Sequence, residues 1–90
     1  RLVEMFGVEV EAELAGPMIY IVNTDTPGFI GKLGTALGEA GINIATFNLG
    51  RRKARDDAAS LVAVDGEIGP QVVENLCRLE GVRRVVPLHL

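Results

Sequence analysis

Two helical patterns, each placed between strand-type patterns, constrain the fold of this 90-residue chain more than any other feature. The helical patterns each begin at a proline, near Pro27 and Pro70, and each ends at a glycine, Gly41 and Gly81. Short apolar runs typical of strands cover residues 18–22, 42–49, 58–65 and 82–88. The order strand, helix, strand, strand, helix, strand predicts an α+β chain with the ferredoxin-like βαββαβ motif.

The arrangement of these elements follows from the handedness of their connections. Right-handed crossovers put both helices on one face of a four-stranded antiparallel sheet. Pro87 places the last strand at a sheet edge, because proline cannot donate a ladder hydrogen bond. The face away from the helices must then be wet, covered by the leading residues, or paired with another chain, and a side-by-side dimer is one solution.

The leading residues have their own strand pattern. Residues 8–14 alternate between apolar and acidic side chains, and residues 1–5 are a candidate partner strand across a turn at Phe6 and Gly7. The chain begins with Arg1 rather than methionine, so we expect it to continue a longer protein. We interpret residues 1–16 as a strand or hairpin leading in from that protein, and residues 17–90 as the βαββαβ domain.

The first helix has a predicted start and a predicted buried face. Thr26 is a candidate N-cap with Pro27 at the first helical position. Its apolar stripe is expected to contain Ile30, Leu33, Leu37 and Ala40, widened by Phe29 and Ala36.

Three glycines, Gly31, Gly34 and Gly38, share another face of the first helix. Each costs about 1 kcal/mol against alanine in a helix interior, so the bare ridge predicts a close approach by a sheet, another helix, a second subunit or a ligand. The charged connection over residues 51–57 is predicted to be a solvated turn, with a phosphate-binding patch as the alternative.

Composition excludes several classes of function. The net charge of −3 argues against nucleic acid, and no apolar run approaches the ~20 residues of a membrane span. A single cysteine, Cys77, cannot form an internal disulfide, which favours the cytoplasm. His89 is the only histidine and there is no C-x-x-C motif, so we expect no metal site and no catalysis by this chain itself.

One place has the chemistry of a binding site, at the turn between the first strand and the first helix. Free N–H groups near Gly28 and Phe29 can receive a carboxylate, and Asp25 can receive an ammonium group. The amides of Asn23 and Asn43 can donate or accept hydrogen bonds. Alternatively, Asp25 and Thr26 only cap the helix and Asn43 only starts a strand. The candidate effector-binding residues are Asn23, Asp25, Thr26, Gly28, Phe29 and Asn43.

Three segments together resemble the ACT regulatory domain. They are Asn-Thr-Asp-Thr-Pro-Gly at 23–28, Gly-Lys-Leu-Gly-Thr-Ala-Leu-Gly at 31–38 and Gly-Ile-Asn-Ile-Ala at 41–45. The pairing of Gly-Lys-x-Gly-Thr with Gly-x-Asn-Ile is similar, more narrowly, to the C-terminal ACT domain of the D-3-phosphoglycerate dehydrogenase family. The resemblance spans essentially the whole chain.

The resemblance implies a function and an assembly. The parent enzyme of that family is an oxidoreductase that oxidises 3-phosphoglycerate with NAD in serine biosynthesis, so NAD belongs to the parent and no cofactor belongs to this chain. L-serine or another small amino acid is the implied effector, held at the seam of an edge-to-edge homodimer by the first-loop polar pair, Asn23 and Asp25, and by Asn43. A purely structural dimerisation module, or an ACT domain of another amino-acid enzyme, is the alternative.

Overall fold

The computed structural model describes residues 2–5, 8–11, 16–24, 27–52 and 57–89. Four strands form one antiparallel sheet in the order β4-β5-β3-β6, so β4 and β6 lie at its edges. The strands of this sheet, in chain order, are β3 (Pro17–Thr24), β4 (Asn43–Arg52), β5 (Asp57–Asp65) and β6 (Val82–His89). The helices are α1 (Phe29–Glu39), between β3 and β4, and α2 (Pro70–Cys77), between β5 and β6. The predicted βαββαβ order and the edge position of the Pro87 strand are confirmed.

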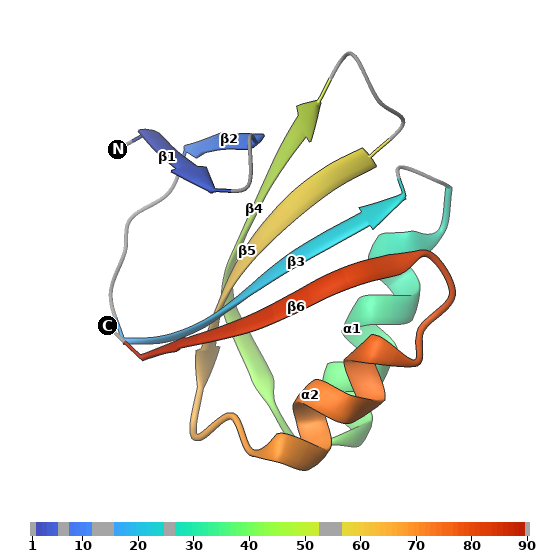
Figure 1. The fold of residues 1–90 in the computed structure, drawn as a ribbon. Helices are drawn as coiled ribbons and strands as arrows, with labels where there is room; N and C mark the ends of the chain where they lie inside the picture. The colour runs from blue at the N-terminus through green and yellow to red at the C-terminus, as the bar shows by residue number, and fades with distance from the viewer. Residues whose placement is uncertain (1, 6–7, 12–15, 25–26, 53–56, 90) are drawn as a thin grey trace.

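Both helices lie on one face of the sheet, as Figure 1 shows. A core of buried apolar side chains fills the space between the two layers. It includes Ile19 and Ile21 from β3, Val62 and Val64 from β5, and Leu33 and Leu37 from α1. The alternation along β3 and β5 follows from the period-2 direction of strand side chains, so residues of the same parity face the helices.

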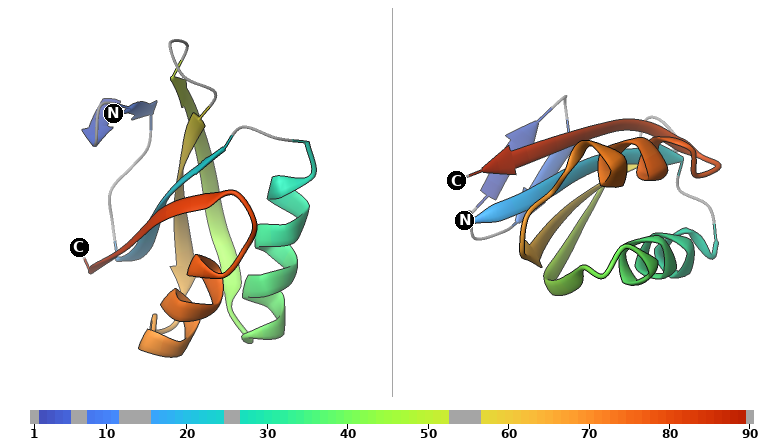
Figure 2. Two further views of the ribbon diagram at one scale, coloured as in Figure 1. Left: turned by 45° about the vertical axis from the view of Figure 1, so that its right-hand side comes forward. Right: turned by 90° about the horizontal axis from the view of Figure 1, so that it is seen from below.

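The opposite face of the sheet is also buried, at Met18, Tyr20 and Leu61. A separate hairpin of β1 (Leu2–Met5) and β2 (Val8–Glu11) lies on that side, next to β4 and β5. Two further views in Figure 2 agree that the hairpin and the helices lie on opposite sides of the sheet. The predicted N-terminal hairpin is therefore confirmed, and of the three options for this face the structure selects covering by leading residues.

Helix α1 begins two residues later than the sequence predicts. Its N-cap is Gly28, with φ 84°, and its first helical residue is Phe29, so the prediction of Pro27 at the first helical position was wrong. Thr26 lies outside the described residues. The C-terminus of α1 matches the prediction at Gly41. The Gly41 N–H donates to Gly38 O over 3.0 Å, and the Ile42 N–H donates to Leu37 O over 2.9 Å. These two hydrogen bonds form a Schellman motif.

The buried face of α1 also differs from the predicted stripe. Phe29, Leu33 and Leu37 are buried at four-residue spacing, whereas Ile30 is 54% exposed and Ala40 is exposed. The start at Phe29 explains the shift, because it places the 29-33-37 row against the sheet and turns Ile30 outward.

The glycine ridge of α1 meets nothing within the described part of the chain. If a Cβ were added at Gly31, Gly34 or Gly38, no heavy atom of the described residues would lie within 4 Å of it, apart from chain neighbours and the backbone of the same helix. No described sheet or helix of this chain is therefore the partner of the ridge, and of the predicted alternatives a second subunit or a ligand is left.

Two smaller predictions have mixed outcomes. Pro70 is at the start of α2, as predicted. The 51–57 connection is not a solvated turn at its end, because Asp57 belongs to β5 and is only 3% exposed. Its Oδ2 lies 3.9 Å from Arg83 Nη1, and this cationic neighbour explains how a carboxylate is accommodated there. Residues 53–56 lie outside the described residues.

Candidate functional site

The junction of β3 and α1 combines the end of a central strand with the start of a helix. Strand β3 ends at Thr24, whose N–H donates to Gly81 O over 2.8 Å and so ties this end to the start of β6. Helix α1 begins after Gly28, whose carbonyl accepts from the Lys32 N–H over 3.1 Å. The N–H groups of the first turn have no acceptor within the helix and carry its positive dipole end, which suits a carboxylate.

Asn23 is buried at this junction rather than presented to solvent, with 3% of its surface exposed. It shares the parity of Ile19 and Ile21 along β3, so its side chain lies on the helix-facing side. Its Nδ2 donates to Thr24 O over 3.0 Å, while its Oδ1 has no hydrogen-bond partner among the described residues. A buried amide oxygen of this kind is an acceptor that a ligand donor can satisfy.

Ser60 is a second polar side chain on the same side of the sheet, and the sequence analysis missed it. It lies opposite Ile21 of β3 and Leu49 of β4, is fully buried, and its Oγ has no partner within the described ranges. The sequence did contain a signal for it. The next helix-facing positions of β5 are the apolar residues Val62 and Val64, so a polar residue at position 60 departs from the pattern.

Two other candidates contribute differently from what the sequence suggests. Phe29 is 4% exposed and belongs to the core, so it offers the site a backbone N–H and not its ring. Gly28 has the left-handed φ that lets the chain turn into the helix. Asp25 and Thr26 lie outside the described residues, so their predicted roles stay predictions.

Asn43 is at the opposite end of the sheet from Asn23. It pairs with Asp65 at one end of β5, whereas Asn23 pairs with Ala58 near the other end. The seven residue steps from Ala58 to Asp65 span about 23 Å at the rise of an extended strand. Within one chain, the structure therefore does not bring Asn43 together with Asn23, Gly28 and Phe29.

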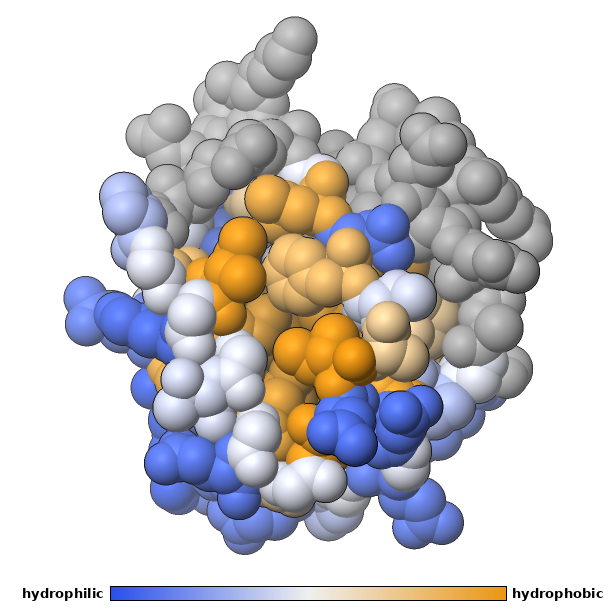
Figure 3. Space-filling model, turned by 180° about the vertical axis from the view of Figure 1, so that it is seen from behind, coloured by the Kyte–Doolittle hydropathy of each residue, from blue (hydrophilic) through white to orange (hydrophobic). Residues whose placement is uncertain are grey.

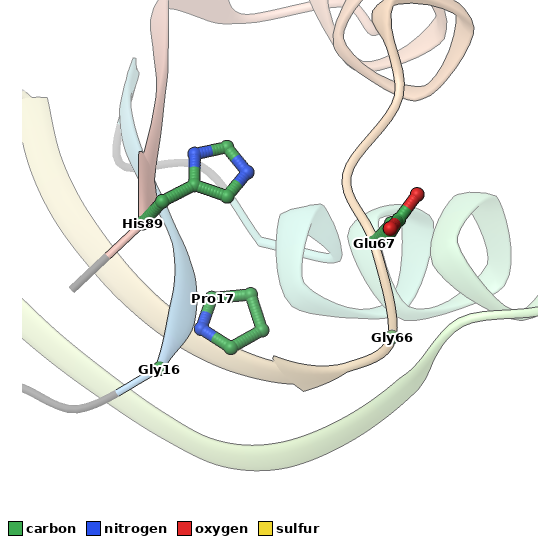
Figure 4. Close-up of a pocket in the computed structure, with 5 residues that line it drawn as sticks. All are labelled: Gly16, Pro17, Gly66, Glu67 and His89. Carbon is green, nitrogen blue, oxygen red and sulfur yellow. The ribbon is translucent and has the colours of Figure 1, made fainter.

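A surface pocket lies at the end of the sheet away from the β3–α1 junction. It has a volume of about 280 Å³ and is lined by Gly16, Pro17, Gly66, Glu67 and His89. Figure 4 shows His89 and Glu67 on separate elements on either side of it. One imidazole and one carboxylate provide two metal ligands at most, fewer than a structural or catalytic metal site uses.

No group of three or more His, Cys, Asp or Glu side chains in the described ranges is placed to hold a metal ion. In the same part of the chain, no helix is long and apolar enough to cross a membrane.

The fold and the position of the polar junction define a class of protein, and a family comparison identifies it. The model of the ACT domain matches residues 18–81, so this chain belongs to the ACT domain family. Its curated relatives are D-3-phosphoglycerate dehydrogenases. The enzyme of Bacillus subtilis is 32% identical over 90 residues, and that of Methanocaldococcus jannaschii is 29% identical over 89 residues. The match covers 100% and 99% of this chain but only 17% of each relative.

A solved structure supports the fold independently. The regulatory subunit of aspartate kinase from Thermus thermophilus, in its ligand-free form, matches with a TM-score of 0.63 at 20% identity. The match covers 88% of this chain and 54% of that one. At this level of identity, the likeness concerns the fold alone.

Proposed function

We propose that this chain is a regulatory domain that binds a small amino acid, with L-serine as the first candidate, between two copies of itself. The observation that carries the proposal is the buried Oδ1 of Asn23 beside the N-terminus of α1, which has no hydrogen-bond partner among the described residues. The helix N-terminus suits the carboxylate of an amino acid and the amide oxygen suits one of its donors. Asp25 is proposed to receive the ammonium group.

The position of Asn43 explains why two copies are needed. It starts β4, which is an edge strand of the four-stranded sheet. Antiparallel pairing of β4 with β4 of a second copy reverses the strand direction across the seam. The Asn43 of the second copy then moves to the end of the joined sheet where Asn23 lies, so a site that is split by about 23 Å in one chain is completed by two.

The whole protein is proposed to be an NAD-dependent D-3-phosphoglycerate dehydrogenase, a cytoplasmic enzyme of L-serine biosynthesis. This rests on the shared identity of the curated relatives over the length of this chain. The NAD and the chemistry would belong to the remainder of that protein. An effector bound between two ACT domains would bias the relative orientation of the parent subunits, with a coupling on the order of 1–3 kcal/mol.

A second candidate function is a dimerisation module without an effector. The burial of Asn23 favours it, because an amide with 3% exposure does not face solvent in the ligand-free chain. The two functions predict the same dimer but differ in their response to amino acids.

Calorimetric titration of the purified protein with L-serine, after its size has been measured by light scattering, separates the two functions. The regulatory function predicts saturable binding to a dimer. Asn43→Ala is expected to weaken this binding tenfold or more while leaving the melting temperature unchanged, because Asn43 is exposed and one charge-assisted hydrogen bond is worth about 1.5–3 kcal/mol. Asn75→Ala, which removes an exposed amide from α2, is the matched control. A folded dimer that binds neither L-serine nor another small amino acid supports the structural module.

A further inference from the structure

An ion pair joins two strands that are not neighbours in the sheet. Asp57 is the first residue of β5 and Arg83 belongs to β6, and β3 runs between these two strands (Figure 1). Strands with one other strand between them lie about 9.5 Å apart. The contact of 3.9 Å between Arg83 Nη1 and Asp57 Oδ2 therefore crosses over β3.

The ion pair crosses β3 at its last residue, Thr24. Asp57 pairs with Thr24 in the sheet register, and by parity both side chains lie on the face away from the helices. On the β6 side, the Thr24 N–H donates to Gly81 O over 2.8 Å. A Cβ added at Gly81 would lie 3.9 Å from Thr24 Cβ, so the two residues are close. Thr24 is thus enclosed between β5 and β6, just before the connection that leads to α1.

A β-bulge in β6 directs Arg83 toward this point. Val22 of β3 pairs with Arg84. The next residue of β3, Asn23, pairs with Val82, so Arg83 is an extra residue without a pairing residue on β3. Bulges bend a strand and change the direction of a side chain. The bulge therefore explains how an arginine of β6 reaches across β3 to a residue of β5.

The two members of the ion pair differ strongly in exposure. The Asp57 side chain is 4% exposed, whereas the Arg83 side chain is 56% exposed. An ion pair with both members exposed contributes little to stability, because water solvates each charge. Water has little access to the Asp57 carboxylate, so loss of the Arg83 charge would leave a buried negative charge less compensated.

We propose that Arg83 is a positioning residue for the candidate effector site. The Asp57–Arg83 ion pair acts as a clamp that holds the end of β3 between β5 and β6. It thereby fixes the point at which the chain leaves the sheet for α1. Asn23 directly precedes the clamped residue, Thr24, and α1 follows at Phe29. The positioning role rests on the proposed function, whereas the clamp itself does not.

Hydrogen exchange in the ligand-free protein tests the clamp. Arg83→Met removes the charge and keeps an unbranched side chain. It is expected to raise the exchange rate of the Thr24 amide about tenfold more than that of the Val62 amide in the core, whereas a general loss of stability would raise both equally. Arg83→Lys keeps the charge and should restore most of the protection. Arg78→Met, which removes the arginine of an exposed ion pair with Glu74, is the matched control and should change neither rate.

Calorimetric titration of the same variants with L-serine tests the positioning role. Arg83→Met is expected to bind L-serine about tenfold more weakly than wild type, because the end of β3 is no longer held in place. Arg83→Lys and Arg78→Met are expected to bind it as wild type does.

Each alternative result has a definite meaning. Equal changes of the Thr24 and Val62 exchange rates in Arg83→Met overturn the clamp. Faster exchange at Thr24 with an unchanged affinity for L-serine overturns the positioning role and leaves the proposed function standing. If wild type binds neither L-serine nor another small amino acid, the proposed function and the positioning role are both overturned, while the exchange rates still decide on the clamp.

Discussion

At the scale of single residues, backbone conformation and burial explain more of the β3–α1 junction than side-chain type does. Gly28 provides the turn into α1 with a φ of 84°, a conformation that L side chains rarely adopt. No heavy atom lies within 4 Å of a Cβ added there, among the described residues, so space is not the reason for glycine at this position. The left-handed backbone is the reason.

Gly28→Ala is therefore expected to destabilise the protein by about 1–2 kcal/mol, through backbone strain alone. Gly31→Ala is the matched control, since it lies three residues away with equally open surroundings but has a helical backbone. That control should be neutral or stabilising, because alanine has the higher helix propensity. Chemical denaturation of the two variants, at a concentration that keeps the chain monomeric, measures the difference, and equal free energies of unfolding would contradict the assignment of strain to Gly28.

At the scale of elements, the start of α1 decides which of its apolar residues belong to the core. Leu37 is fully buried between α1 and the sheet, whereas Ile30 is 54% exposed although both belong to the stripe that the sequence predicts. The two residues are therefore expected to contribute differently to the free energy of unfolding, although their side chains are similar.

Leu37→Ala is expected to lower the free energy of unfolding by about 2–5 kcal/mol, because it leaves a cavity in the core. Ile30→Ala should change it by no more than about 0.5 kcal/mol in the isolated chain. Thermal denaturation at a concentration that keeps the chain monomeric tests this contrast. A large loss in Ile30→Ala under those conditions would show that the observed helix face is wrong.

At the scale of the whole molecule, α1 and β4 offer surface to a partner. The glycine ridge of α1 meets no other described residue, β4 is an edge strand of the described four-stranded sheet, and Ile30 and Ile44 are exposed. Figure 3, a view from behind relative to Figure 1, shows an apolar patch in the middle of one face with hydrophilic residues beside it. These features are consistent with the proposed two-copy assembly, which would cover surface that is costly to leave in water.

Ile44→Lys is expected to convert the proposed dimer into a folded monomer, since a lysine on an edge strand opposes pairing with a second edge. It should also abolish amino-acid binding, because the proposed site needs Asn43 from the second copy. Gln71→Lys on α2 adds the same charge at an exposed position away from β4 and should leave the dimer intact. Sedimentation analysis measures both variants, and an unchanged dimer in Ile44→Lys would place the interface elsewhere.

The sequence by itself determined the order of the elements, the edge position of β6 and the end of α1 at Gly41. These are local properties: side-chain periodicity, the missing N–H of Pro87 and the left-handed conformation available to glycine each act over a few residues. The same local signals located the polar junction at Asn23 and Gly28, and the resemblance in residues 23–45 indicated the ACT family that the comparison established.

Only the tertiary structure decided which of these residues meet. Asn43 lies about 23 Å along the sheet from Asn23, because β3 and β4 run in the same direction and Asn43 is at the start of β4 whereas Asn23 is near the end of β3. The register of β5 against β3 places Ser60 diagonally next to Asn23. The start of α1 at Phe29 turns Ile30 away from the core. Distances between elements depend on register and packing across the whole chain, and local periodicity contains no information on them.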